Sequence, residues 1–370
     1  MRYYIIAGEA SGDLHASNLM RGLCACDPAC DIRFWGGDAM SAVGGTPVRH
    51  CRDLAVMGGI AVAARARTLC DNLALCKKDL AAWGPDAVIL VDYPGFNLKI
   101  ARYAKKQGMK VFYYIAPKVW AHHARRVENL RRDVDVLYSI LPFEPEWFGE
   151  RGVEARYFGN PLVDSLAEIP VRPLEGGPRI ALLPGSRQAE LKFLMPRYAA
   201  LERLLAADER FAGYRLTLAA APTMRPEDFR KYLPSNSKME IVVDRTRDVL
   251  ASSRAAVVCS GTASLEAALL GTPQVVCYGF DALSWQVARR VVKVPYVSLP
   301  NLVLGRLLVP ERLQEAASPE GLFRELERLL TDDSVRTAMT AGYEELKTAF
   351  GGPGASRRIA NDIYEQVARI

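Results

Sequence analysis

The chain has 370 residues, a length that corresponds to about two domains of ordinary size. Half of the residues are hydrophobic and 24% are charged, which is the composition of a globular protein. A formal net charge of +6 is small for this length and does not indicate a nucleic-acid-binding protein. The first residues do not resemble a signal peptide, and no uncharged apolar run reaches the ~18 residues needed to span a bilayer. We therefore expect a cytoplasmic protein.

Cysteine usage agrees with this expectation. The spacing of the early cysteines matches no standard zinc pattern, and no histidine lies nearby at ligand spacing. We expect reduced, mostly buried thiols and no metal site. Six of the eight cysteines lie before position 80, at Cys24, Cys26, Cys30, Cys51, Cys70 and Cys76.

Strands and helices are predicted to alternate along the first half of the chain. The expected strands are residues 3–7, 32–35, 87–91, 111–115 and 136–140, and the expected helices are residues 13–25 and 99–107. Such alternation is typical of a parallel sheet covered by helices on both faces.

Residues 168–178 contain three prolines and two glycines, a composition typical of an interdomain linker. The alternation then restarts, with strands expected at 179–183, 214–220, 240–243, 255–259 and 274–278. We predict two Rossmann-like α/β domains facing each other across a cleft, at residues 1–167 and 179–337. Residues 338–370 look helical, with a break at 351–354. They either return to the first domain or cross to a partner chain.

The turn after the first strand is rich in small and acidic residues. Gly8 and Gly12 would let the backbone approach a ligand closely, and Asp13 can cap the following helix. Two glycines with two carboxylates exceed what a tight turn needs, although a simple turn stays an alternative. We assign Glu9 and Asp13 to catalysis and Gly8, Ser11 and Gly12 to substrate binding. The spacing is not G-x-G-x-x-G, so it does not predict NAD binding.

Asp92 follows the expected strand 87–91. A carboxylate at the carboxyl end of a buried strand can point into a ligand crevice, where burial raises its pKa toward that of a useful base. Asn97 follows on the same turn and is assigned to substrate binding. A helix cap or a turn-forming residue is the alternative role for Asp92.

Residues 257–278 predict a strand, a small-residue turn, a helix and a second strand. The turn Ser260-Gly261-Thr262 opens the helix, whose free N–H groups and positive dipole end form an anion site that extends to Ala263. Glu266 lies one helical turn deeper, where its carboxylate can accept bonds from ribose hydroxyls. The pattern indicates a nucleoside diphosphate bound without a P-loop.

Other polar residues in the second half are candidates for the same ligand. Arg187 follows the strand 179–183 and offers forked donors to phosphate, although Glu190 could pair with it instead. Asn301 offers a donor and an acceptor to a sugar or base edge. Gln314 and Glu315 are added as substrate-binding candidates, with helix surface as the alternative.

Two segments suggest a membrane surface. Residues 99–132 carry ten basic residues against Glu128 alone, which indicates solvated helix faces or a surface for anionic phospholipid or a phosphorylated substrate. Residues 54–64 are mostly apolar and are followed by Arg65 and Arg67. They form either a core element or a segment buried in the bilayer interface.

Together these residues resemble the lipid-A-disaccharide synthase family, GT-B glycosyltransferases of the lipopolysaccharide pathway. The matching motifs occur in the family's order and cover the chain from end to end. This chain has His122-His123 where many members carry a Trp-Arg pair. The motifs are Gly8-Glu9-x-Ser11-Gly12-Asp13, residues 54–58, Asp92-x-Pro94-x-Phe96-Asn97, Val119-Trp120-Ala121, residues 141–144, residues 182–190, Ser260-Gly261-Thr262-Ala263-x-Leu265-Glu266 and residues 296–301.

The resemblance implies transfer of 2,3-diacylglucosamine from UDP to 2,3-diacylglucosamine 1-phosphate, with inversion and release of UDP. It places UDP in the second domain and makes Asp92 the candidate base. It also suggests a homodimer with exchanged C-terminal segments. We expect no cofactor, and no metal because no acidic triad lies near these residues. The apolar and basic segments predict peripheral association with the inner face of the inner membrane. Three alternatives stay open. The first is another UDP-GlcNAc enzyme with this fold, such as an epimerase or the peptidoglycan GlcNAc transferase. The others are a non-catalytic UDP-lipid-binding protein and a hydrolase using Ser11, Asp13 and His15.

Overall fold

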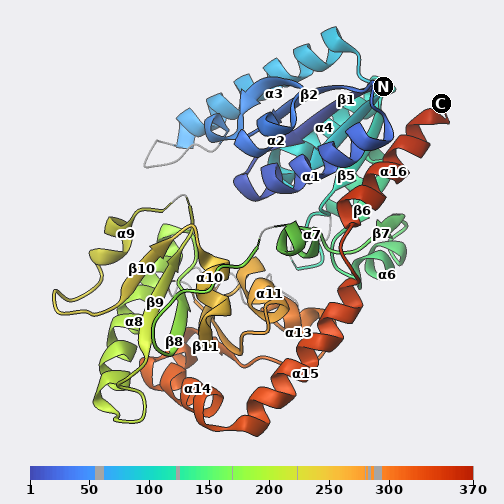
Figure 1. The fold of residues 1–370 in the computed structure, drawn as a ribbon. Coiled ribbons are helices and arrows are strands. Elements are labelled where there is room, and N and C mark those ends of the chain that lie inside the picture. The colour runs from blue at the N-terminus through green and yellow to red at the C-terminus, as the bar shows by residue number, and fades with distance from the viewer. Residues whose placement is uncertain are drawn as a thin grey trace. The chain divides into compact units, whose positions relative to one another are not determined.

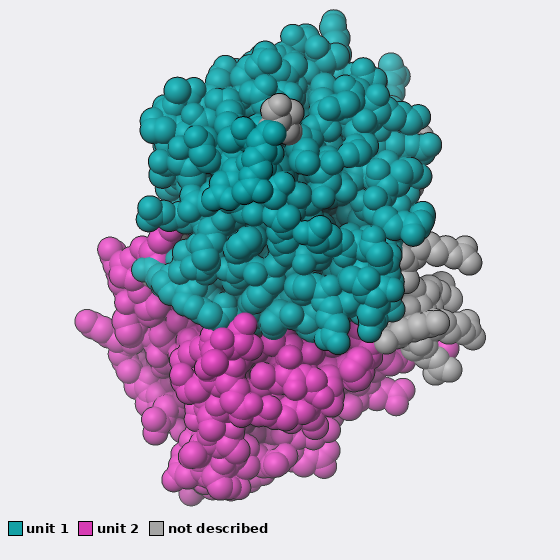
Figure 2. Space-filling model, turned by 90° about the vertical axis from the view of Figure 1, so that its right-hand side faces the viewer, with its two compact units in different colours: residues 1–167, 350–370 teal, residues 168–349 magenta. Residues whose placement is uncertain are grey.

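The structure is a computed structural model, and it describes residues 1–54, 62–121, 126–168, 170–222, 224–279, 281, 285–286 and 294–369 (Figure 1). The chain forms two compact units, which are coloured separately in Figure 2. The first unit contains Met1–Ala167 together with Phe350–Ile370, and the second contains Glu168–Ala349. Each unit is built on its own parallel sheet.

The first sheet has seven strands in the order β3-β2-β1-β4-β5-β6-β7, and every pair of neighbours is parallel. Side chains alternate between its two faces, so Tyr3 and Ile5 of β1 enter one core cluster while Tyr4 and Ile6 enter the other. Both faces are therefore covered, as the sequence pattern predicts. The strands are β1 (Arg2–Ala7), β2 (Asp31–Gly36), β3 (Thr46–His50), β4 (Ala87–Val91), β5 (Lys110–Tyr114), β6 (Val136–Ser139) and β7 (Ala155–Tyr157).

Helices connect these strands and supply the covering layers. The helices of the first unit are α1 (Ala10–Cys26), α2 (Asp38–Val43), α3 (Val62–Trp83), α4 (Pro94–Lys106), α5 (Val127–Asp133), α6 (Glu144–Gly149), α7 (Pro161–Glu168) and the C-terminal α16 (Ala355–Ala368).

The second sheet repeats this topology with the order β10-β9-β8-β11-β12-β13, again all parallel. Its strands are β8 (Arg179–Leu183), β9 (Arg215–Ala220), β10 (Glu240–Val243), β11 (Ser253–Cys259), β12 (Gln274–Tyr278) and β13 (Glu311–Leu313). Its helices are α8 (Gln188–Ala207), α9 (Pro226–Arg230), α10 (Thr246–Ala251), α11 (Thr262–Leu269), α13 (Leu299–Leu304), α14 (Pro319–Thr331) and α15 (Asp333–Phe350). Both units thus have the Rossmann-like fold predicted from the sequence.

The C-terminal helix α16 packs on α1 of its own chain. The carboxylate of Asp164 accepts bonds from the backbone N–H groups of Gly354 at 2.6 Å and Ser356 at 2.8 Å, which satisfies the start of α16. The two helices approach closely, because a Cβ built on Gly22 would lie 2.7 Å from the Cβ of Ala360. Of the two alternatives left open by the sequence, the structure has the return to the first unit.

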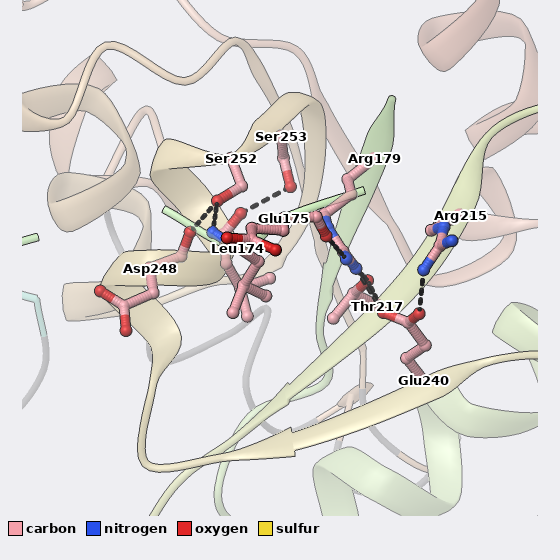
Figure 3. A network of polar contacts seen from close by, with 10 residues as sticks. Leu174, Glu175, Arg179, Arg215, Thr217, Glu240, Asp248, Ser252 and Ser253 are labelled. Atoms are coloured by element: carbon pink, nitrogen blue, oxygen red, sulfur yellow. Dashed lines mark hydrogen bonds and ion pairs between the residues drawn. The ribbon is translucent and has the colours of Figure 1, made fainter. Parts of the chain in front are cut away.

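The proline-rich segment before β8 is fastened to the second unit (Figure 3). The backbone N–H of Leu174 donates to the Ser252 hydroxyl at 2.6 Å, and the buried Arg179 donates to the Glu175 carbonyl at 2.7 Å. Arg179 also contacts Glu240, which links the start of β8 to β10. Residues 172–178 therefore belong to the second unit and are held against it by these bonds.

Three sequence predictions need correction. Helix α1 begins at Ala10, not Asp13, and helix α4 begins at Pro94, not at residue 99. The thiols are not mostly buried: all eight cysteines are free, but only Cys51, Cys76, Cys259 and Cys277 are buried.

Candidate functional site

Four of the candidate turns lie where the strand order of each sheet reverses. In the first sheet the reversal lies between β1 and β4, and in the second between β8 and β11. In open α/β sheets, ligands bind at the carboxyl ends of the strands at such points. The turns 8–13 and 92–97 follow β1 and β4, and the turns 184–187 and 260–263 follow β8 and β11. Each unit thus has one candidate ligand site at its switch point.

Asp92 is held in an unusual backbone conformation at the end of β4. Asp92 and Tyr93 have φ values of 47° and 49°, a left-handed conformation that costs free energy for non-glycine residues. The Asp92 carbonyl accepts bonds from the Asn97 side-chain amide at 2.8 Å and the Tyr113 hydroxyl at 2.6 Å. Asn97 and Tyr113 are completely buried, so the core fixes this turn. Strain maintained in this way is frequent at functional sites.

The surroundings of Asp92 favour a base. Burial raises the pKa of its carboxyl group, and the negative charge of Glu9 raises this pKa further. The positive charge of Lys118 and the backbone N–H of Tyr93 act in the opposite direction. A carboxylate with a raised pKa is a stronger base near neutral pH, so this group can accept a proton from a substrate hydroxyl.

The glycines after β1 have a packing role that the sequence did not reveal. A Cβ on Gly8 would lie 2.3 Å from the Tyr93 ring, which itself stacks on Phe96 with ring centroids 5.7 Å apart. Gly12 is buried inside α1, where a Cβ would meet Ala7 at 3.6 Å. We expected both glycines to admit a ligand. At Gly8, however, the Tyr93 ring occupies that space.

Asp13 does not cap its own helix. Its buried carboxylate accepts the backbone N–H groups of Gly37 at 2.7 Å, Ala39 at 3.0 Å and Met40 at 3.1 Å, and so caps the start of α2. The capping expectation is corrected, because α1 starts three residues before Asp13. Three donors occupy this carboxylate, whereas Glu9 and Ser11 are exposed on the same turn.

In the second unit, the N-terminus of α8 is capped by the side chain of Glu190, a residue of the same helix. One oxygen of Glu190 accepts the N–H groups of Ser186 at 2.9 Å and Arg187 at 3.1 Å, and the other accepts the Arg187 guanidinium at 3.1 Å. The alternative pairing of Arg187 with Glu190 is therefore present. The Arg187 side chain is nevertheless 77% exposed.

The start of α11 is open by comparison. Gly261 has φ 144° and ψ −157°, a conformation essentially restricted to glycine, and no described side chain caps the helix. The Ser260 hydroxyl donates to the Val297 carbonyl at 2.9 Å, and the Ser260 N–H donates to the Cys277 carbonyl at 3.3 Å. The donors at this end therefore begin after Ser260, at Gly261, Thr262 and Ala263. Such N–H groups suit an anion.

Glu266 forms an ion pair that the sequence did not predict. Its Oε1 accepts from the Arg247 guanidinium at 2.7 Å, and both side chains are only 16% exposed. This pair fixes the direction of the Glu266 carboxylate one turn below the open end of α11.

Asn301 has an internal role. Its amide nitrogen donates to the Val309 carbonyl and to Glu311, each at 2.8 Å, and its oxygen accepts the N–H groups of Leu308 at 2.8 Å and Val309 at 2.9 Å. The side chain is fully buried, and these four bonds use all of its capacity. The expected direct contact with a sugar or base does not fit this geometry.

The remaining second-unit candidates lie just after β13. Gln314 has a left-handed backbone with φ 54°, and Glu315 is exposed in the short 3₁₀ helix Gln314–Ala317. The carboxyl end of β13 faces the same edge of the sheet as that of β11. Both residues are therefore at the ligand-binding edge.

Two sequence predictions concern residues that the structure does not describe. Most of the segment 54–64 and the pair His122-His123 lie outside the described residues. Within the described ranges, no three His, Cys, Asp or Glu side chains cluster as metal ligands, and no helix is long and apolar enough to cross a membrane.

Comparison with known proteins identifies the family. The family model described as lipid-A-disaccharide synthetase matches residues 3–353. A lipid-A-disaccharide synthase of Anaeromyxobacter dehalogenans is 38% identical, over 97% of this chain and 96% of its own length. The synthase of Trichlorobacter lovleyi is 36% identical, over 99% and 97%. This chain belongs to the lipid-A-disaccharide synthase family.

Solved structures agree with this assignment at the level of the fold. A UDP-GlcNAc 2-epimerase of Neisseria meningitidis, bound to UDP-GlcNAc, superposes with a TM-score of 0.68 at 11% identity, covering 99% of this chain and all of that one. The calicheamicin glycosyltransferase CalG4 gives a TM-score of 0.60 at 16% identity, covering 100% and 99%. The GT-B fold predicted for this member of the lipid-A-disaccharide synthase family is confirmed.

Proposed function

We propose that this enzyme transfers 2,3-diacylglucosamine from UDP to the 6-hydroxyl of 2,3-diacylglucosamine 1-phosphate. The products are the β-1,6-linked disaccharide 1-phosphate and UDP. Membership of the lipid-A-disaccharide synthase family over nearly the whole chain carries this proposal. The fold likeness to epimerases is at 11–15% sequence identity and does not favour an epimerase.

On the acceptor side, Asp92 is the proposed general base. The acceptor oxygen forms a bond to the anomeric carbon of the donor sugar while its proton passes to the Asp92 carboxylate. General-base catalysis of this kind contributes typically ~10²–10⁴-fold to a rate. The raised pKa of Asp92 supports this role, as does the strained turn that Asn97 and Tyr113 hold in place.

On the donor side, the bond between the anomeric carbon and the diphosphate oxygen breaks with inversion. The open N–H groups of α11 and the exposed guanidinium of Arg187 are proposed to hold the departing charge. Glu266, directed by Arg247, is proposed to accept the ribose hydroxyls. Because amides and Arg187 meet the phosphate charge in this scheme, turnover should persist in excess EDTA.

The other candidate polar residues receive supporting roles in this proposal. Asp13 fixes the start of α2, Asn97 fixes Asp92, and Asn301 fixes the loop before β13. Glu9 raises the pKa of the base, and Gln314 and Glu315 remain proposed donor contacts.

The enzyme is further proposed to work at the inner face of the cytoplasmic membrane, as a homodimer. The apolar segment 54–64 and the basic residues between 99 and 132 support contact with anionic lipid. Sedimentation with anionic liposomes at low salt tests the first part, and light scattering tests the second. Failure to sediment would remove the membrane proposal without affecting the reaction.

The experiment for the reaction is incubation with UDP-2,3-diacylglucosamine and 2,3-diacylglucosamine 1-phosphate, with products identified by mass spectrometry. The proposal predicts a tetraacyl disaccharide 1-phosphate and one UDP per product. Turnover of UDP-GlcNAc alone would favour an epimerase-like activity, and tight UDP binding without product would favour a carrier. Labelling of Ser11 by a fluorophosphonate would favour the hydrolase.

A further inference from the structure

The turn that follows β5 presents one lysine between buried neighbours. Ile115 has φ 63°, which is a genuine outlier for a β-branched residue. The Val119 N–H donates to the Pro117 carbonyl at 2.6 Å, and the Ala121 N–H donates to the Lys118 carbonyl at 3.1 Å. Pro117 and Val119 are buried, whereas Lys118 is exposed. The backbone around this single cation is therefore tightly constrained.

A buried carboxylate fastens this turn to the neighbouring loop. Glu144 is completely buried, and its Oε1 accepts the Trp120 indole N–H at 2.9 Å. Its Oε2 accepts the N–H groups of Ile140 and Leu141, each at 3.0 Å. Trp120 also packs edge-on against Phe143, with ring centroids 5.2 Å apart. The loops after β5 and β6 are thus joined at the edge of the sheet that carries Asp92.

The positive charge of Lys118 acts on two carboxylates, those of Asp92 and Glu144, and it forms no described ion pair with either. Its charge lowers the pKa of Asp92 and of Glu144, while burial raises both pKa values. Within the described ranges no ion pair of 4.0 Å or less involves Lys118. Glu144 is already engaged by three N–H donors, and Glu9 is the other charged group that acts on Asp92. Lys118 therefore keeps its hydrogen-bond donors for a ligand.

We propose that Lys118 binds the phosphate group of the acceptor substrate. This inference rests on the proposed function, because the acceptor hydroxyl must lie within hydrogen-bond distance of Asp92. The rest of the acceptor sugar then lies over the neighbouring turns, including the turn after β5. There the Lys118 ammonium can bind the 1-phosphate. A lysine acts as a point charge for phosphate, so it selects a phosphorylated acceptor without demanding one orientation.

The test compares two acceptors: 2,3-diacylglucosamine 1-phosphate, and 2,3-diacylglucosamine, which lacks the phosphate. For Lys118→Met, we expect the KM of the phosphorylated acceptor to rise about tenfold to a hundredfold, as for loss of a charged hydrogen bond. The KM of the unphosphorylated acceptor and the KM of the donor should stay unchanged. Lys118→Arg should restore most of the preference. Lys78→Met is the matched control, because Lys78 is an exposed lysine of α3 in the same unit.

Equilibrium binding of the two acceptors to the inactive Asp92→Asn protein, with and without Lys118→Met, tests the same point without turnover. Lys118→Met should abolish the preference for the phosphorylated lipid. An equal loss for both acceptors, an unchanged preference, or a rise in donor KM alone would overturn the inference. Absence of product from the wild-type enzyme would instead overturn the proposed function, since the binding comparison does not depend on turnover.

Discussion

The side-chain amide of Asn97 donates a hydrogen bond of 2.8 Å to the backbone carbonyl of Asp92. This bond joins the first turn of α4 to the end of β4 and holds a left-handed aspartate in place. Asn97→Ala should therefore lower kcat more than it raises KM, because the base loses its position while the substrate contacts remain. Steady-state kinetics measure this split. A rise in KM alone, with kcat unchanged, would contradict the positioning role.

Replacing the base itself gives a larger effect. Asp92→Asn should lower kcat by about 10²–10⁴-fold. Asp86→Asn is the control, because Asp86 precedes the same strand at its other end and its substitution should leave kcat unchanged. Near-wild-type turnover of Asp92→Asn would remove Asp92 as the base.

The same substitution should stabilise the fold at neutral pH. The folded-state pKa of Asp92 is raised, so the folded protein binds this proton more tightly than the unfolded chain does. Its contribution to stability is present below the unfolded pKa of about 3.9 and is lost as pH rises through the folded value. At pH 7 the folded protein therefore pays the free-energy cost of a buried, charged Asp92 carboxylate. Asp92→Asn removes this cost, so thermal unfolding at pH 7 should occur at a higher temperature than in the wild type.

The pH dependence of kcat/KM should report the neighbours of Asp92. The acid limb should lie above the pH of about 3.9 that is typical of aspartate, because the base must lose its proton. Glu9→Gln removes a like charge and should move the limb to lower pH, whereas Lys118→Met removes a stabilising cation and should move it higher. Shifts of the same sign in both variants would contradict the electrostatic assignment.

The open end of α11 can be tested with two equivalent glycines. Gly261 and Gly271 flank this helix, both at positive φ, and a Cβ on either would meet nothing within 4 Å. Alanine at either position should lower the unfolding temperature through backbone strain. Only Gly261→Ala should weaken UDP binding measured by calorimetry, by about tenfold for the disturbance of one charged hydrogen bond. Equal UDP affinity in both variants would exclude the start of α11 as the diphosphate site.

Whether a strand could be predicted from the sequence depended on how deeply it is buried in its sheet. Every central strand was recognised, because β1, β4, β8 and β11 are almost uniformly apolar. The strands that were missed are β3, β7 and β13, three edge strands whose residues are at best half-buried. Such strands lack the continuous apolar run of a buried strand, and β3 even contains a proline.

The candidate site was also only partly predictable from the sequence, because some of its contacts form only in the folded chain. The sequence predicted the positions of Asp92, Arg187 and the 260–263 turn, because each follows a buried strand, β4, β8 or β11. It did not identify the tasks of Asp13 and Asn301, because the bonding partners of Asp13 lie more than twenty residues away and those of Asn301 are backbone groups of an irregular loop. Arg247, Glu144 and Tyr113 were missed as well, since only the folded chain brings them to Glu266, Trp120 and Asp92.

The most direct measurement is a crystal structure of the protein with UDP. We expect phosphate oxygens within about 3.2 Å of the N–H groups of Thr262 and Ala263, and the pentose hydroxyls on the Glu266 carboxylate. A nucleotide bound at another position, with Glu266 still paired only with Arg247, would contradict the central claim that the carboxyl edge of the second sheet holds the donor.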